Sequence, residues 1–155
     1  MKDLIPWHGP LVSGSAIASI LLVSAVVQFS AKSLLPAKSL ILGLITLVVS
    51  FVLLGLCMSM QWSILFFISD ILVGVGHGLG LLGAFGLIHQ MTTTDNRAAV
   101  MSTYLFIGYL GTIVPIIAVG YLADHFGLTT GILGFCLGVG LLCLALIFWR
   151  KKISS

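Results

Sequence analysis

Residues 62–88 read WSILFFISDILVGVGHGLGLLGAFGLI, an apolar stretch that contains one formally charged side chain, Asp70. An α-helix rises about 1.5 Å per residue, so roughly 20 apolar residues cross the hydrocarbon core of a bilayer, which is about 30 Å thick. A single β-strand is excluded because its backbone N–H and C=O groups would lack partners in lipid. The stretch therefore predicts a transmembrane helix.

The rest of the chain has the same character. Hydrophobic residues make up 59% of the 155 residues and charged residues 7%, with no Glu, whereas an ordinary soluble domain is about 25% charged. We therefore predict an all-α integral membrane protein in which residues 1–155 form one polytopic region in the lipid bilayer. The predicted spans are approximately residues 11–31, 39–58, 62–88, 98–122 and 128–149. The net charge of +3 is scattered, which argues against nucleic-acid binding, because that function needs a clustered basic face.

The positions of the cations predict the orientation of the spans. If the N-terminus is outside, the cytoplasmic side receives six of the seven Lys and Arg residues, namely Lys32, Lys38, Arg97, Arg150, Lys151 and Lys152. The inverted topology would place those six outside, so the positive-inside rule favours an external N-terminus and a cytoplasmic C-terminus in a plasma (inner) membrane. A cleavable signal peptide within residues 1–31 is the alternative, although Asp3 offsets Lys2.

The third predicted span is rich in glycine. Gly78, Gly80 and Gly83 match the G-x-G-x-x-G pattern of a dinucleotide-binding turn, but that turn needs a preceding strand and a soluble strand–helix–strand unit. Gly74 with Gly78, and Gly76 with Gly80, instead form small-xxx-small pairs, which let the backbones of membrane helices approach closely. The glycines therefore predict helix packing rather than a cofactor site.

Asp70 and His77 are seven residues apart, so they lie on one face of the third span. An ionisable group within a membrane span normally faces the interior of a helix bundle or a water-filled cavity. Burial disfavours the charged form of either group, so both are candidates for lining a cavity and for taking up and releasing a proton. The alternative is that Asp70 caps a neighbouring helix and His77 is a neutral, hydrogen-bonded core residue.

The other spans carry weaker signals. Pro115 deprives the Gly111 carbonyl of its usual donor, which predicts a kink or hinge in the fourth span. The first span has two polar stripes, Ser13, Ser24 and Gln28 on one and Ser15, Ser19 and Ser30 on the other, which indicate protein neighbours on two faces. The second and fifth spans have no charge in their interiors and are the better candidates for facing lipid.

Nothing in the sequence predicts catalysis, a metal site or a cofactor. Ser, His and Asp are present, but without a nucleophile elbow, metal-spaced ligands or paired carboxylates. The three cysteines, Cys57, Cys136 and Cys143, are interpreted as small apolar fillers.

A resemblance to a known family begins at the cytoplasmic loop after the third span. The residues that carry it are Arg97, Ser102, Gly108, Gly111, Pro115, Gly120, Tyr121, Leu122, Ala123, Asp124 and Gly127. This stretch resembles the tenth loop and the eleventh and twelfth spans of a major facilitator superfamily transporter. The glycine-rich stretch from Gly74 to Gly86 resembles that family's tenth span, so the chain would correspond to spans eight to twelve of the C-terminal six-helix bundle.

The resemblance implies alternating access of two six-helix halves around a site at the membrane midplane. It implies that spans eight, ten and eleven line the cavity and that spans nine and twelve face lipid. The chain departs from the family in the loop around Pro36, which retains only Lys32 and Lys38, and in having no counterpart of the N-terminal half or the seventh span.

Two functions therefore remain open. The first is secondary transport of a small-molecule substrate, with proton-coupled efflux as one form of it. The transporter would be a C-terminal fragment or split-gene product whose partner is the N-terminal transporter half or another membrane helix bundle. The second is a small helical membrane protein that packs against a membrane partner and stabilises or regulates it.

Overall fold

The computed structural model describes residues 10–60 and 62–153, with side chains described for residues 14–57, 60, 62–127 and 129–149. This part of the chain is helical apart from short connections. The helices are α1 (Pro10–Ser30), α2 (Pro36–Met60), α3 (Ser63–Met91), α4 (Arg97–Phe126) and α5 (Leu128–Ile153). The all-α fold is confirmed, and every predicted span lies within four residues of the observed helix at both ends.

Four of these helices are long and apolar enough to cross a membrane. Their apolar segments are Pro36–Cys57, Ser63–Met91, Arg97–Phe126 and Thr129–Trp149, while the described part of α1 contributes a shorter apolar segment, Gly14–Ser30. These lengths match the thickness of a bilayer, so the described chain is that of a membrane-embedded helical protein.

Local signals explain where the helices begin and end. Pro36 is the first residue of α2, a position where its missing N–H group costs nothing. Before α4, the side-chain Oδ1 of Asn96 accepts a hydrogen bond of 2.9 Å from the backbone N–H of Thr93. After α4, Gly127 has a φ of 88°, a conformation that glycine adopts without a steric cost, and its N–H donates to the Ala123 carbonyl at 3.0 Å.

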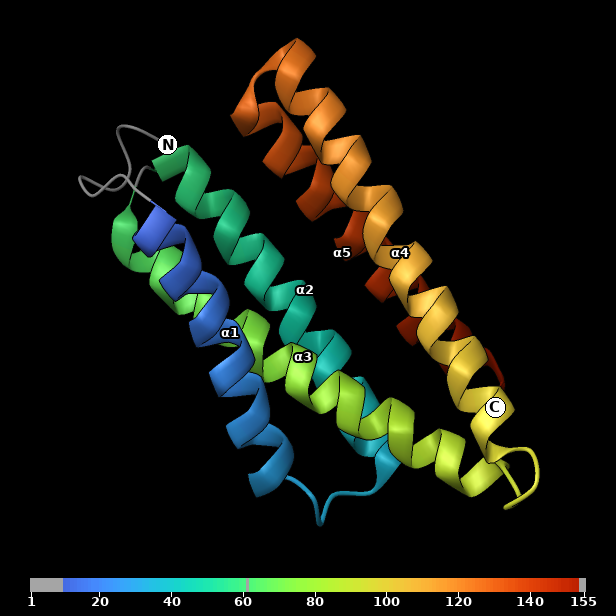
Figure 1. Cartoon of the computed structure of the whole chain (residues 1–155). Coiled ribbons are helices and arrows are strands. Elements are labelled where there is room, and N and C mark those ends of the chain that lie inside the picture. Colours follow the sequence, from blue (N-terminus) through green and yellow to red (C-terminus); the bar gives the residue numbers. More distant parts are fainter. Residues whose placement is uncertain (1–9, 61, 154–155) are drawn as a thin grey trace.

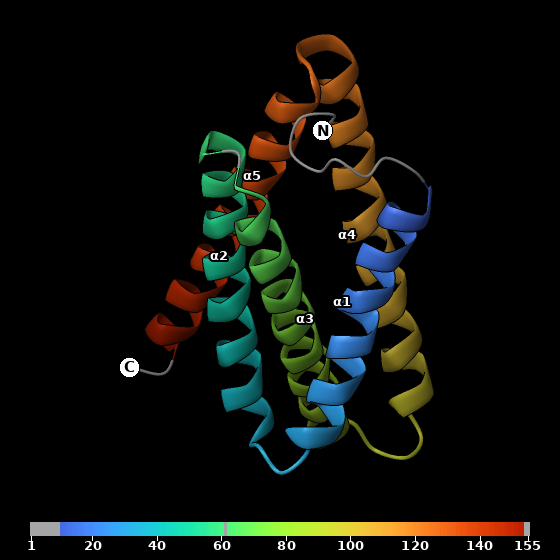
Figure 2. The same ribbon diagram turned by 90° about the vertical axis from the view of Figure 1, so that its left-hand side faces the viewer.

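The helices pack in an order that differs from their order in the sequence. Helix α3 lies between α1 and α2, α2 also packs on α5, and α5 packs on α4 (Figures 1 and 2). Helix α4 meets α3 near the loop that joins them, where the rings of Phe85 and Tyr104 form an edge contact with centroids 5.6 Å apart. Since α2 packs on two helices, only part of its surface is left to face lipid.

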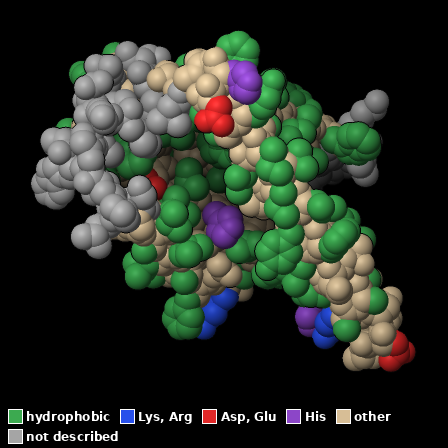
Figure 3. Space-filling view, turned by 45° about the horizontal axis from the view of Figure 1, so that its top comes forward, with side chains coloured by type: hydrophobic (Ala, Val, Ile, Leu, Met, Phe, Trp, Pro, Cys, Tyr) green, Lys and Arg blue, Asp and Glu red, His purple; other side chains and the backbone are tan. Residues whose placement is uncertain are grey.

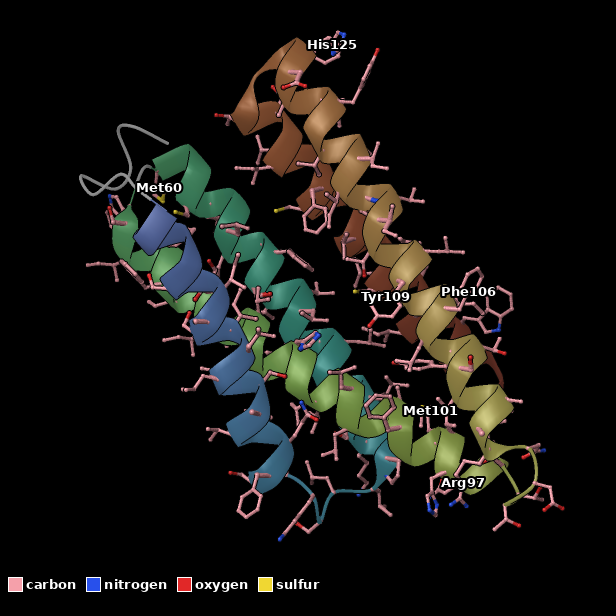
Figure 4. The ribbon with its side chains drawn as sticks, in the orientation of Figure 1. Met60, Arg97, Met101, Phe106, Tyr109 and His125 are labelled. Carbon is pink, nitrogen blue, oxygen red and sulfur yellow. The ribbon has the colours of Figure 1, made fainter. Side chains whose placement is uncertain are left out.

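The connections between helices lie at two opposite ends of the bundle (Figure 1). Arg97 marks the end that holds the α1–α2 and α3–α4 loops, while Met60 and His125 lie at the other end (Figure 4). Lys32 belongs to the α1–α2 loop and Lys38 to the first turn of α2. The structure thus places these cations at the same end as Arg97, as the predicted up-and-down order of the spans requires.

The contact between α2 and α3 brings backbone against backbone. A Cβ atom built on Gly43 of α2 would lie 2.6 Å from the Gly80 backbone nitrogen, and one built on Gly83 would lie 2.5 Å from the Leu40 nitrogen. A Cβ on Gly76 would lie 2.8 Å from the side chain of Leu47. Gly80 takes part through its backbone alone, because a Cβ there would meet no atom within 4 Å.

A second glycine face of α3 meets α1. A Cβ atom on Gly74 would lie 2.9 Å from the Ile20 carbonyl oxygen, and one on Gly78 would lie 2.7 Å from the Ser24 carbonyl oxygen. Small residues at four-residue spacing allow such close approach between membrane helices. The two glycine faces therefore fix α3 against both neighbours.

Candidate functional site

Asp70 is half-buried and faces the first helix. Its Oδ2 atom lies 2.5 Å from the hydroxyl oxygen of Ser19, which itself lies 2.7 Å from the carbonyl oxygen of Ala16 one turn earlier in α1. No Lys, Arg or His side chain in the described part of the chain forms an ion pair with Asp70. The described partner of this carboxyl is therefore a hydroxyl group rather than a cation.

His77 lies two turns further along α3 and also meets α1. Its Nδ1 atom is 3.0 Å from the hydroxyl oxygen of Ser24, and the side-chain amide of Gln28 donates to the same oxygen at 3.2 Å. One arrangement satisfies all three groups: Ser24 accepts from Gln28 and donates to Nδ1 of a neutral imidazole that carries its proton on Nε2. Ser24 is only 2% exposed, whereas the His77 side chain is exposed.

These contacts form a polar seam between α1 and α3, which we define as Ser19, Ser24, Gln28, Asp70 and His77. Asp70 and His77 lie on one face of α3, as predicted, and both side chains contact α1. Their serine and glutamine partners were not assigned from the sequence. The signal for them was the pair of polar stripes on the first span, from which we predicted protein neighbours on two faces. In the described part of the chain, Ser19 of one stripe and Ser24 of the other both bond to α3, the one helix that α1 contacts.

The described surface of the molecule contains a hollow. Figure 3 shows this hollow, surrounded mainly by hydrophobic side chains, with a histidine side chain exposed in it. No described residue of α4 is buried. Tyr109 is 68% exposed, and Figure 4 shows it on the side of α4 opposite to that of Phe106, toward the other helices.

The predicted hinge lies in a continuous helix. Pro115 is inside α4, and a Cβ atom on Gly111 would meet nothing within 4 Å. An apolar cavity of about 200 Å³ lies beside Pro115, between α4 and α5, and is lined in part by Gly134 and Gly138. The structure therefore leaves space beside Pro115, and the helix α4 continues without a break on both sides of this residue.

Arg97 begins α4, where its backbone N–H donates to the Thr93 carbonyl at 3.1 Å. Its Nε atom is buried and has no hydrogen-bond partner among the described residues. Arg97 lies at the opposite end of α4 from His125 (Figure 4), so it does not join the polar seam.

The described residues contain no cluster of three or more His, Cys, Asp or Glu side chains suited to a metal ion. All three cysteines are buried. No protein-family model, curated protein or solved structure matches the chain.

Proposed function

We propose that the protein acts in secondary transport of a small molecule across a membrane, as part of a transporter of the major facilitator type. The observation that carries this proposal is the polar seam, which places a carboxyl and an imidazole on one face of an apolar helix. Ionisable groups at membrane depth are costly and are kept where they serve a substrate path or a proton relay. Asp70 and His77 are the proposed coupling groups.

The surface of α4 supports the proposal that a further helical unit completes the transporter. Several of its large apolar side chains, among them Ile113, Ile116 and Ile117, are at least half exposed, and no residue of α4 is buried. We infer that the N-terminal half of a transporter, or another helix bundle, packs beside the hollow and closes the substrate path. The hinge role of Gly111 and Pro115 belongs to the same proposal.

The topology is tested with reporter tags. We expect tags after the C-terminus and in the loop at Asp95 to report the cytoplasm, and a tag between Asp124 and Gly127 to report the outside, because this orientation places six of seven cations inside. A cytoplasmic signal from the Asp124 loop would contradict both the orientation and the correspondence to spans eight to twelve.

Transport itself is tested in vesicles that contain the protein together with any partner encoded immediately upstream of its gene. The vesicles enclose a pH-sensitive dye, and a panel of small molecules of different charge is added outside. We expect at least one compound to change the internal pH faster than in protein-free vesicles. If no compound does so when the partner is present, the transport proposal fails.

A stabilising partner protein is the second candidate function, and the exposed apolar surface of α4 favours it equally. The two candidates differ at His77, which should contact water in a transporter and lie against a partner helix in a scaffold. We expect H77C to react with a small, charged thiol reagent in membranes, because His77 is exposed.

The matched control is S69C, because Ser69 lies on the same helix and is only 1% exposed. The three native cysteines are buried, so their background reaction should be low. Equal protection of positions 77 and 69 in the assembled complex would favour the scaffold over the transporter.

A further inference from the structure

Ser19 makes two close oxygen contacts, but its hydroxyl group has a single hydrogen. Its Oγ atom lies 2.7 Å from the Ala16 carbonyl oxygen and 2.5 Å from Asp70 Oδ2. Two oxygen atoms at these distances need a hydrogen between them. A carbonyl and an ionised carboxylate have none to give, so Ser19 can supply only one of the two. A protonated Asp70 would supply the second hydrogen.

We propose that Asp70, Ser19 and the Ala16 carbonyl form a proton-binding site between α3 and α1. The carboxylic acid of Asp70 donates to Ser19 Oγ, and the Ser19 hydroxyl donates to the Ala16 carbonyl oxygen. The ligand is one proton, taken from water when the carboxylate is protonated and returned to water when the acid ionises. This inference deepens the proposed function, on which its biological purpose rests, but proton occupancy is measurable without transport.

Among the residues that the structure describes, no charged side chain forms a hydrogen bond or ion pair with Asp70 or Ser19. Residues 10–30 of α1 contain no ionisable side chain. On α2, Cys57 donates to the Trp62 carbonyl, and on α4, Tyr104 packs on Phe85. His77, the next titratable group along α3, bonds to Ser24.

Other ionisable side chains of the packed helices make no contact with Asp70 in the described part of the chain: Lys38 on α2, His89 on α3, and Arg97, Tyr109, Tyr121, Asp124 and His125 on α4. Lys2, Asp3 and His8 lie outside the described residues. A neutral acid is the form that a hydroxyl partner and an apolar helix interface accommodate without an unpaired charge.

The test is infrared spectroscopy of the protein in lipid vesicles. Protonated carboxyl groups give a C=O stretching band that ionised ones lack, and subtraction of the D70N spectrum isolates the band of Asp70. We expect this band to be present in the wild-type protein and to disappear as the pH is raised. Its absence at every pH at which the protein stays folded would overturn the proposal.

The sign of a second effect tests the direction of the hydrogen bond. We compare variants at the pH at which the wild-type band has half its maximum. S19A removes the acceptor of the acid proton, so the ratio of protonated to ionised Asp70 should fall about three- to tenfold, the effect of one neutral hydrogen bond. If Ser19 instead donates to a carboxylate, the same variant would raise that ratio, and the proposal would be wrong.

The matched control is S69A. Ser69 precedes Asp70 in the sequence, and its hydroxyl donates to a carbonyl three residues earlier, as that of Ser19 does, but it does not meet the carboxyl. S69A should leave the Asp70 band unchanged. S19T keeps a hydroxyl group at position 19 and should therefore restore the wild-type ratio of protonated to ionised Asp70. A change of equal size in S69A and S19A would overturn the proposed role of Ser19. Failed transport with an intact Asp70 band would reject the transporter alone, whereas transport without the band would reject the proton site alone.

Discussion

Adding one methyl group to α2, as G43A, is expected to lower the free energy of unfolding by about 1–3 kcal/mol, the usual cost of overpacking a core. The new Cβ would lie 2.6 Å from the Gly80 nitrogen and 2.9 Å from the Gly76 carbonyl oxygen. Both atoms belong to the backbone of α3, so no side chain can rotate away. The whole helix has to move, and the measurement is unfolding of the purified protein in mixed detergent micelles.

The matched control is a variant of Gly80, which lies on the opposite side of the same contact. G80A places its Cβ in open space and replaces glycine with the best helix former, so we expect unchanged or slightly increased stability. G138A on α5, where a Cβ also meets nothing within 4 Å, controls for the general effect of removing a helical glycine. Equal losses in G43A, G80A and G138A would contradict the proposed backbone contact between α2 and α3.

The second large effect is expected at Asp70. If the proposed transport function is correct, D70N should abolish the dependence of transport on a proton gradient, because asparagine cannot bind and release a proton. Its side-chain amide can either donate to Ser19 Oγ or accept from it, so the contact, folding and membrane insertion should survive. Transport of the identified substrate is measured with and without a pH gradient, beside a measurement of the amount of protein in the membrane.

Two variants sharpen this experiment. H77Q should reduce coupling less than D70N, because its amide can replace the hydrogen bond of a neutral imidazole to Ser24. S69A changes a neighbouring hydroxyl that does not meet the carboxyl and should transport normally. Wild-type pH dependence in D70N would leave Asp70 with a structural role, and loss of D70N from the membrane would favour the scaffold.

The positions of the helices along the chain were predictable because hydropathy and charge change together at their ends. Lys32, Arg97 and the Gly127 turn interrupt the apolar runs, and the observed bounds follow them. The lateral order of the helices was not predictable. Glycine spacing indicates that α3 approaches other helices closely, but it does not identify Gly43 as the opposing residue, because that pairing depends on the axial position of α2.

The candidate site was also predicted only in part, because pairing of side chains between helices depends on the relative positions of the helices. Helical periodicity is enough to place Asp70 and His77 on one face, since it depends on one helix alone. Pairing Asp70 with Ser19 and His77 with Ser24 requires the depth and rotation of α1 relative to α3, and these are set by the Gly74 and Gly78 contacts. The sequence contains the partners but not the register between the two helices.

The glycine faces of α3 also have an entropic consequence. A leucine or methionine that packs between two helices loses rotamer freedom when they associate, whereas a glycine has no side chain to immobilise. At Gly74, Gly76, Gly78 and Gly83, α3 contributes no side chain of its own to the contact, and it meets the side chains of Val23 and Leu47 as well as backbone atoms of its neighbours. We therefore expect the α1–α2–α3 unit to move as a block, and any rearrangement to fall along α4, where no residue is buried.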